Sequence, residues 1–212
     1  MFLIDVSQSD YFGTTNQFKN EMMTEIAAVL SFSAIQNNDK VGLLLFTDKV
    51  ETYIPPKKGK QHILRIIREL LDFKPHSNGT DIQNALRHFN NMMKKRSITF
   101  LMSYFIDQNY EKALNIVGRR HDLIGINIYD IREKELPSVG MVRFRDPETS
   151  KLKWIDTSSH NVRKLFSNWH EEHMIDLKQT FIRSKADLIS IRTDEPYTTS
   201  LLNFFKNRGK RR

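Results

Sequence analysis

Apolar segments of strand length alternate with segments of helical periodicity along most of this chain, and this alternation constrains the fold more than any other feature. Residues 41–46 are apolar throughout and residues 97–102 are mostly apolar, as expected for parallel strands that helices cover on both faces. Strands joined by helices of this size form doubly wound sheets with right-handed crossovers. The sequence therefore predicts an α/β fold with a mostly parallel central sheet and helices on both faces.

Hydrophobic periodicity and turn residues give the expected bounds of the elements. Strands are expected at about residues 2–4, 41–46, 50–54, 97–102, 123–129 and 188–191, and helices at about 18–35, 61–71, 80–93, 110–120, 161–184 and around 201–205. Residues 50–54 mix polar and apolar side chains ahead of two prolines, which predicts a short antiparallel edge strand. Residues 141–145 and 152–156 alternate in period two, which predicts a β-hairpin insertion at about 141–156.

The whole chain, residues 1–212, is expected to form a single domain. A buried strand begins almost at the first residue, which leads us to expect a further N-terminal region ahead of it. The other end carries a basic tail at about residues 206–212.

Composition narrows the class of protein. Hydrophobic residues make up 39% of the chain and charged residues 27%, which fits a soluble globule rather than a disordered segment. No apolar run approaches the roughly 20 residues that span a bilayer, and cysteine is absent, so we expect a cytoplasmic protein without disulfides or thiolate metal sites. The net charge of +8 lies partly in the tail and is not interleaved with aromatic residues, so no specific nucleic-acid binding is expected.

The loop after the first strand places one carboxylate and two hydroxyls at alternate positions, in the order Asp5, Ser7 and Ser9. Thr80, at another strand-to-helix edge, adds a third hydroxyl. Such hard oxygen ligands suit Mg²⁺, which keeps several of its waters in proteins. The alternative is that these hydroxyls only cap helices and shape turns, and Thr80 and Gln83 indeed have the spacing of a capping box.

Asp5-Val6-Ser7-Gln8-Ser9 resembles the metal-ion-dependent adhesion site of von Willebrand factor A domains, in which this loop, a threonine and a later aspartate surround one divalent cation. Further segments resemble the bacterial family catalogued as domain of unknown function 58. They are Phe12-Gly13-Thr14, the segment 38–46, Pro55-Pro56-Lys57-Lys58-Gly59-Lys60, Gly79-Thr80-Asp81, Arg96-Ser97, Arg120-His121-Asp122, Glu135-Leu136-Pro137, Asp146-Pro147-Glu148-Thr149, Phe204-Phe205 and Arg208.

The resemblance implies a von Willebrand factor A-like, non-catalytic module for protein–protein interaction, whose partner is a MoxR-type AAA+ ATPase or a client of that ATPase. It implies that Asp5, Ser7, Ser9 and Thr80 hold Mg²⁺ or Mn²⁺, with Ser103, Asp81 and Asp107 as supporting candidates. Tyr104 stands where the family usually has an aspartate, which predicts either a weak cation site or a site that has lost its cation.

Two other hypotheses belong to different classes of function. An aspartate at the end of the first strand is also typical of Mg²⁺-dependent phosphohydrolases, but these need a second aspartate two residues on, where this chain has Ser7. His170 and His173 lie three apart on a predicted helix, yet no third metal ligand accompanies them, so a polar helix face with one aromatic side chain turned inward is expected there. The sequence favours a binding module over an enzyme.

Overall fold

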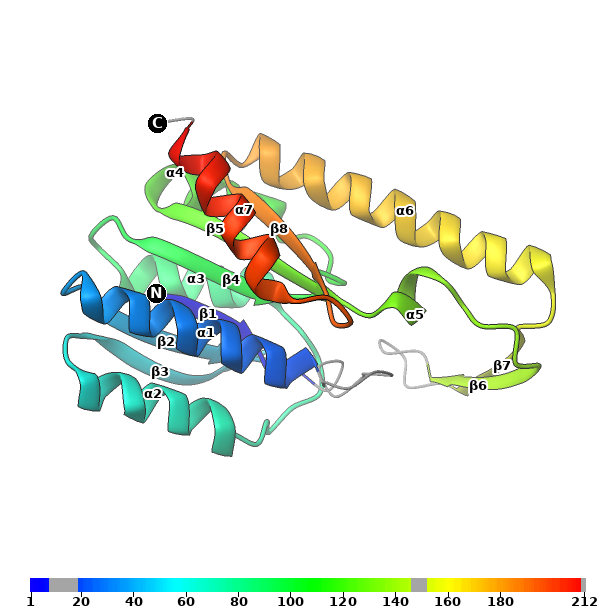
Figure 1. Cartoon of the computed structure of the whole chain (residues 1–212), viewed down its shortest axis with the longest axis horizontal. Helices are drawn as coiled ribbons and strands as arrows, with labels where there is room; N and C mark the ends of the chain where they lie inside the picture. The colour runs from blue at the N-terminus through cyan, green and yellow to red at the C-terminus, as the bar shows by residue number, and fades with distance from the viewer. Residues whose placement is uncertain (8–18, 146–151, 211–212) are drawn as a thin grey trace.

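The structure is a computed structural model that describes residues 1–7, 19–145 and 152–210. Within these ranges, six strands form one sheet in the order β3-β2-β1-β4-β5-β8 (Figure 1). The strands of this sheet are β1 (Phe2–Asp5), β2 (Val41–Phe46), β3 (Val50–Lys57), β4 (Ile98–Ser103), β5 (Asp122–Tyr129) and β8 (Asp187–Arg192). Every neighbouring pair is parallel except β2 and β3, which are antiparallel. The predicted α/β class and the antiparallel edge strand are therefore confirmed.

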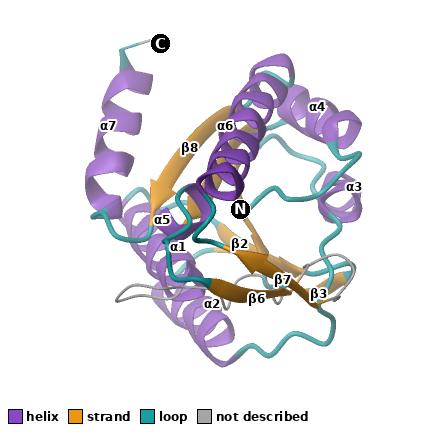
Figure 2. Cartoon of the chain, turned by 90° about the vertical axis from the view of Figure 1, so that its right-hand side faces the viewer, coloured by secondary structure: helices purple, strands orange, loops and turns teal. Residues whose placement is uncertain are grey.

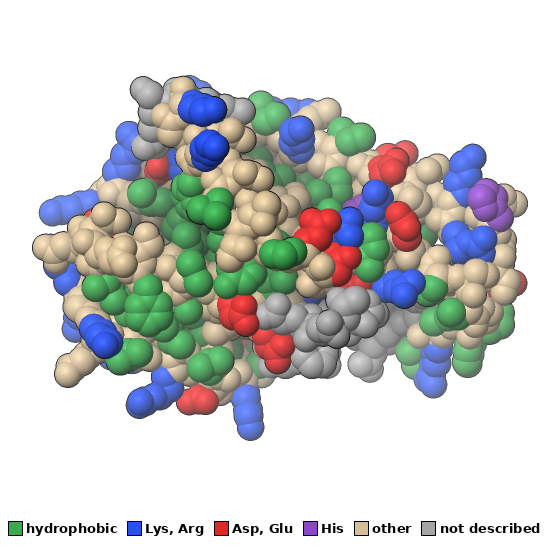
Figure 3. Space-filling view, viewed as in Figure 1, with side chains coloured by type: hydrophobic (Ala, Val, Ile, Leu, Met, Phe, Trp, Pro, Cys, Tyr) green, Lys and Arg blue, Asp and Glu red, His purple; other side chains and the backbone are tan. Residues whose placement is uncertain are grey.

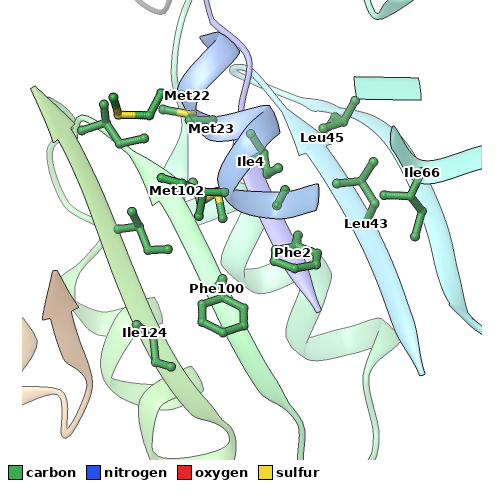
Figure 4. Close-up of a cluster of buried hydrophobic side chains, with 14 of the residues drawn as sticks. Phe2, Ile4, Met22, Met23, Leu43, Leu45, Ile66, Phe100, Met102 and Ile124 are labelled. Carbon is green, nitrogen blue, oxygen red and sulfur yellow. The ribbon is translucent and has the colours of Figure 1, made fainter. Parts of the chain in front are cut away.

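Helices cover both faces of the sheet (Figure 2). One face carries α1 (Lys19–Gln36), α2 (Lys60–Asp72) and α7 (Tyr197–Gly209), and the other carries α3 (Ile82–Met92), α4 (Glu111–Arg120) and α6 (His160–Arg183). The apolar cluster under α1 joins Met22 and Met23 to strand residues such as Ile4 and Met102 (Figure 4). Because β1 lies between β2 and β4, all four of its residues are buried, which explains its apolar sequence.

The predicted hairpin is present as β6 (Met141–Arg145) and β7 (Leu152–Asp156), which pair antiparallel. It projects beyond the edge at which β1 ends, together with the N-terminal half of α6 (Figure 1). One short helix, α5 (Ile131–Lys134), was not predicted. It is held by a capping box in which Asp130 accepts from the backbone and Glu133 accepts from the backbone N–H of Asp130.

One sequence expectation about α6 is wrong, and the basic residues near the C-terminus are partly packed against the sheet. The aromatic side chain expected to face inward from this helix was Trp169, but Trp169 is half exposed. The neighbouring His170 is buried instead, with its ring 5.5 Å from that of Tyr129. The expected basic tail is helical as far as Gly209, and its Arg208 forms ion pairs with Asp122 and Asp187. Arg208 thus ties α7 to two strands instead of extending into solvent.

The remaining basic side chains are dispersed over the face shown in Figure 3 and do not gather in one patch. None of the helices in the described ranges has the length and apolar character that a membrane crossing requires.

Candidate functional site

The carboxyl ends of β1 and β4 bring two of the predicted site residues together. Asp5 ends β1 and Ser103 ends β4, and the parallel register pairs Ile4 with Met102, one residue earlier on each strand. The Ser103 hydroxyl donates a hydrogen bond of 2.7 Å to Asp5 Oδ2. Ser103 Oγ also accepts from the backbone N–H of Phe105 at 3.1 Å. The strand pairing therefore fixes both the position of the carboxylate and the orientation of its hydroxyl partner.

The loop after β1 and the segment before α3 complete this cluster. The backbone N–H of Ser7 donates to Asp5 Oδ1 at 3.1 Å, and the Thr80 hydroxyl donates to Ser7 Oγ at 2.9 Å. Asp5, Ser7, Thr80 and Ser103 thus converge from three separate parts of the chain. Ser9, the remaining predicted ligand, lies outside the described residues.

Asp5 is a desolvated carboxyl group. It is 1% exposed, and its burial raises its pKa from 3.8 to about 6, although hydrogen bonds from Ser103 and Ser7 lower the pKa in part. Asp5 forms no ion pair with a described residue. A buried carboxylate without a counterion is costly, so a cation beside Asp5 would stabilise its charged form.

The predicted capping box between Thr80 and Gln83 does not form. Asp81 is the N-cap of α3, and its carboxylate accepts from the backbone N–H of Asn84 at 2.7 Å. Aspartate caps a helix at least as well as threonine, because its carboxylate also complements the helix dipole. Asp81 is therefore committed to α3, and the Thr80 side chain is directed to Ser7 instead.

Asp107 lies beside this site without presenting free oxygens to it. Its Oδ2 accepts from the backbone N–H of Ile82 and its Oδ1 from that of Gln108, both at 2.7 Å. Burial raises the pKa of Asp107, and its negative charge contributes to the raised pKa of Asp5. Asp107 thus links the segment after β4 to the start of α3 and adds a second negative charge near Asp5.

Tyr104 faces away from Asp5, into the apolar cluster on the α1 side of the sheet. The ammonium nitrogen of Lys19 lies 3.5 Å from the centre of the Tyr104 ring, and Lys19 is ion-paired with Glu133 of α5. Lys19 itself is 2% exposed. The position at which the family usually has an aspartate is therefore filled by a ring that packs under a buried ammonium group.

Lys19 and Glu133 were not predicted to lie at this site. Asp130 and Glu133 have capping-box spacing, which could have predicted α5 and placed Glu133 at this edge. Nothing in the local pattern distinguishes Lys19 from a solvated lysine at a helix start, because its partner is 114 residues away.

The donor set at Asp5 suits a hard divalent cation. One carboxylate and the hydroxyls of Ser7, Thr80 and Ser103 are oxygen ligands, and the Asp5 carboxylate lacks a counterion among the described residues. No cluster of three or more acidic or histidine side chains that could enclose a metal occurs in the described ranges. A cation held here would therefore keep several of its own waters, which is the habit of Mg²⁺.

Comparison with known proteins gives relatives along the whole chain. An uncharacterized protein of Mycobacterium tuberculosis is 25% identical over 211 residues, which cover 98% of this chain and 66% of the relative. The chain thus spans about two thirds of the length of that relative. An uncharacterized protein of Mycobacterium avium is 24% identical over 162 residues, covering 75% of this chain and 95% of the relative.

Solved structures share the fold at low sequence identity. An aerotolerance-related membrane protein from Bacteroides fragilis superposes with a TM-score of 0.60 at 14% identity, covering 95% of this chain and 94% of that one. The conserved hypothetical protein BatB from Bacteroides thetaiotaomicron superposes with a TM-score of 0.59 at 12% identity, covering 95% and 92%.

The model of the family described as "Protein of unknown function DUF58" matches residues 1–176, more than four fifths of the 212 residues. Together with the sheet order, this match confirms the resemblance inferred from the sequence motifs. The chain belongs to the DUF58 family and has a doubly wound, mostly parallel α/β fold.

Proposed function

We propose that this protein is a non-catalytic interaction module that binds a protein partner at the carboxyl edge of its sheet through a divalent cation. Asp5 anchors the cation, Ser7, Ser9 and Thr80 provide hydroxyl ligands, and Ser103 orients the Asp5 carboxylate. The cation is Mg²⁺ or Mn²⁺, and a carboxylate of the partner completes its coordination shell. From the family resemblance, the partner is a MoxR-type AAA+ ATPase or one of its clients.

The observation that carries this proposal is the buried Asp5 carboxylate, which is held by Ser7 and Ser103 and has no ion-pair partner among the described residues. A structural aspartate in an α/β core is normally paired or replaced by an apolar residue, because an uncompensated buried charge destabilises the fold. A carboxylate buried next to two further hydroxyl groups is instead typical of a site that a cation completes.

A metal-independent interaction is the second candidate, and a specific observation favours it. Lys19 lies over the Tyr104 ring, and both oxygens of Asp107 accept backbone hydrogen bonds, so Asp5 is the single carboxylate directed into the site from the described residues. With one anionic ligand the affinity for Mg²⁺ is expected to be low. In this alternative the same edge binds the partner by direct contacts.

A partner-binding experiment separates the two candidates. Binding of the immobilised protein to the MoxR-type ATPase encoded in the same genome would be measured by interferometry in Mg²⁺ and in EDTA, for the wild type and Asp5→Ala. We expect EDTA and Asp5→Ala each to weaken binding by about tenfold or more, since each removes the metal bridge.

Glu135→Gln, which changes an exposed carboxylate elsewhere, should leave that binding unchanged. Binding that resists both EDTA and Asp5→Ala would contradict the metal bridge and support the metal-independent alternative.

A further inference from the structure

A pocket of about 340 Å³ lies beside the candidate cation site, between the segment that follows β4 and the middle of α6. This volume is within the range of pockets that take small ligands or single side chains. The segment after β4 contributes Phe105 and residues 107–111, and α6 contributes His173, Asp176 and Leu177. Asp107, which borders both sites, places the pocket next to Asp5.

The floor of the pocket is apolar and aromatic. Phe105 and Leu177 are almost fully buried, and the ring of Phe105 lies 6.2 Å from that of Tyr110. Phe105 also packs edge-on against Phe181 at 5.2 Å, which fixes its orientation from below. Such a floor can accept the methylene stem of a long side chain and, through the ring faces, a positive charge.

The rim of the pocket is anionic. Asp107, Glu111 and Asp176 line it, and no lysine or arginine does, although the chain as a whole carries a net charge of +8. Glu111 and Asp176 are exposed and form no hydrogen bond or ion pair with any described residue. His173 is neutral near pH 7, because burial lowers its pKa, so it does not offset the carboxylates.

Tyr110 adds a polar group to the lining of this pocket. Its side chain is 5% exposed, and its hydroxyl forms no hydrogen bond with another described residue, so the hydroxyl is solvated within the pocket. Burial and the charges of Glu111, Asp107 and Asp176 raise its pKa, so the hydroxyl keeps its proton and faces these carboxylates. A tyrosine carries an apolar ring and a polar hydroxyl, so Tyr110 can contact both the stem and the head of a long basic side chain.

We propose that this pocket binds a basic side chain, arginine or lysine, of the protein partner. The aromatic floor takes the stem, Glu111 and Asp176 pair with the cationic head, and the Tyr110 hydroxyl contacts the same group or a water bound to it. This inference rests on the proposed function, since it assumes that the partner docks at this edge. It adds that the partner presents a carboxylate and a basic residue close together.

The carboxylate and the basic side chain of the partner would bind at different parts of this edge. A carboxylate of the partner would meet the cation at Asp5, and a basic side chain would meet the acidic pocket, so a reversed orientation would place like charges together. Such complementary pairs fix the register of a complex and exclude wrong partners.

The test uses N-acetyl-L-arginine amide as a probe and follows backbone resonances of the full chain by ¹H–¹⁵N NMR in EDTA. We expect saturable shifts confined to residues 105–111 and 173–177, with a dissociation constant of about millimolar order, as suits a single side chain. N-acetyl-L-citrulline amide, which has the same shape without the charge, should cause no such shifts. N-acetyl-L-lysine amide tells whether the pocket prefers a guanidinium or an ammonium group.

Matched variants locate the binding. The double variant Glu111→Gln with Asp176→Asn should weaken arginine-amide binding by about tenfold, because both charged acceptors are lost. Tyr110→Phe should weaken it by about threefold while keeping the ring. Glu171→Gln with Glu172→Gln removes the same charge from an exposed part of α6 and should have no effect.

Because the probe is titrated without metal, Asp5→Ala should bind it as the wild type does, so failure of the cation site would not affect the outcome. The proposed binding of a basic side chain would be wrong if the Glu171 and Glu172 control weakened arginine-amide binding equally. It would also be wrong if the chemical-shift changes were scattered near other carboxylates.

Discussion

Asp5→Asn is expected to raise the melting temperature of the protein in EDTA at pH 8 by about 4 °C, and to abolish any stabilisation by Mg²⁺. The rise in the Asp5 pKa from 3.8 to about 6 corresponds to about 3 kcal/mol by which the charged form disfavours folding well above pH 6. Asparagine removes the charge but cannot accept both hydrogen bonds that Asp5 receives from Ser7 and Ser103. The net increase in the free energy of unfolding of Asp5→Asn over the wild type is therefore about 1–2 kcal/mol.

The sign of the pH dependence follows from the same shift. The folded wild type holds the Asp5 proton more tightly than the unfolded chain does, so its stability falls as the pH rises from about 4 to about 6. Asp5→Asn should lack this loss of stability. The variant should therefore gain little stability over the wild type at pH 4 and the whole expected gain at pH 8. Thermal unfolding across this pH range, with Glu135→Gln as the control, measures the difference. A lower melting temperature for Asp5→Asn at pH 8 in EDTA would mean that Asp5 is a stabilising structural residue.

Lys19→Met is expected to destabilise the protein by about 3 kcal/mol at pH 8, because it leaves the partly buried Glu133 carboxylate without its ion-pair partner and uncovers the Tyr104 ring. Burial already raises the pKa of Glu133, and Lys19 is the largest influence that lowers it, so the variant should hold a proton on Glu133 at a higher pH. The destabilisation should therefore shrink as the pH falls towards 5.

Denaturant unfolding at pH 8 and pH 5 measures this effect. Lys40→Met, at an exposed lysine just after α1, is the matched control and should change stability by less than about 0.5 kcal/mol. The double variant Lys19→Met with Glu133→Gln should recover about half of the loss, because the orphaned charge is gone. An equal loss at both pH values without recovery in the double variant would show that Lys19 contributes through its packing alone.

The architecture follows from local patterns that a single sequence displays. The run at 41–46 is apolar throughout, as in a strand covered on both faces, and it forms the inner strand β2. The segment at 50–54 mixes polar and apolar residues, and it forms the edge strand β3. The hairpin and its pairing register likewise follow from period-two alternation around a turn.

The parts that the sequence did not predict depend on contacts between distant residues. Asp81 and not Thr80 caps α3, because the Thr80 hydroxyl donates its hydrogen bond to Ser7, which is 73 positions away. His170 is buried in place of Trp169 because Tyr129 packs against it from β5. Arg208 is paired because Asp122 and Asp187 end up side by side at the start of two parallel strands.

In the candidate site, too, some residues were predictable from the sequence and others were not. Asp5, Ser7 and Thr80 were identifiable from residue type and their positions at strand ends. In the structure Ser7 links the other two, since its backbone N–H donates to Asp5 and its hydroxyl accepts from Thr80. The buried Lys19 and the pocket at Tyr110 were not identifiable, since each is assembled from segments more than 60 residues apart. A carboxylate introduced at Tyr104 would lie next to the Lys19 ammonium, so the Tyr104 position is unsuited to a simple restoration of the family's aspartate.

Titration of Mn²⁺ into the purified protein, followed by EPR and by competition with Mg²⁺, measures cation binding at Asp5. We expect a single saturable site with a dissociation constant of about millimolar order, from which Mg²⁺ displaces Mn²⁺. This binding should be abolished in Asp5→Ala and retained in Glu135→Gln. The absence of saturable binding to the wild type, or binding that persists unchanged in Asp5→Ala, would contradict a cation site at the carboxyl edge of the sheet.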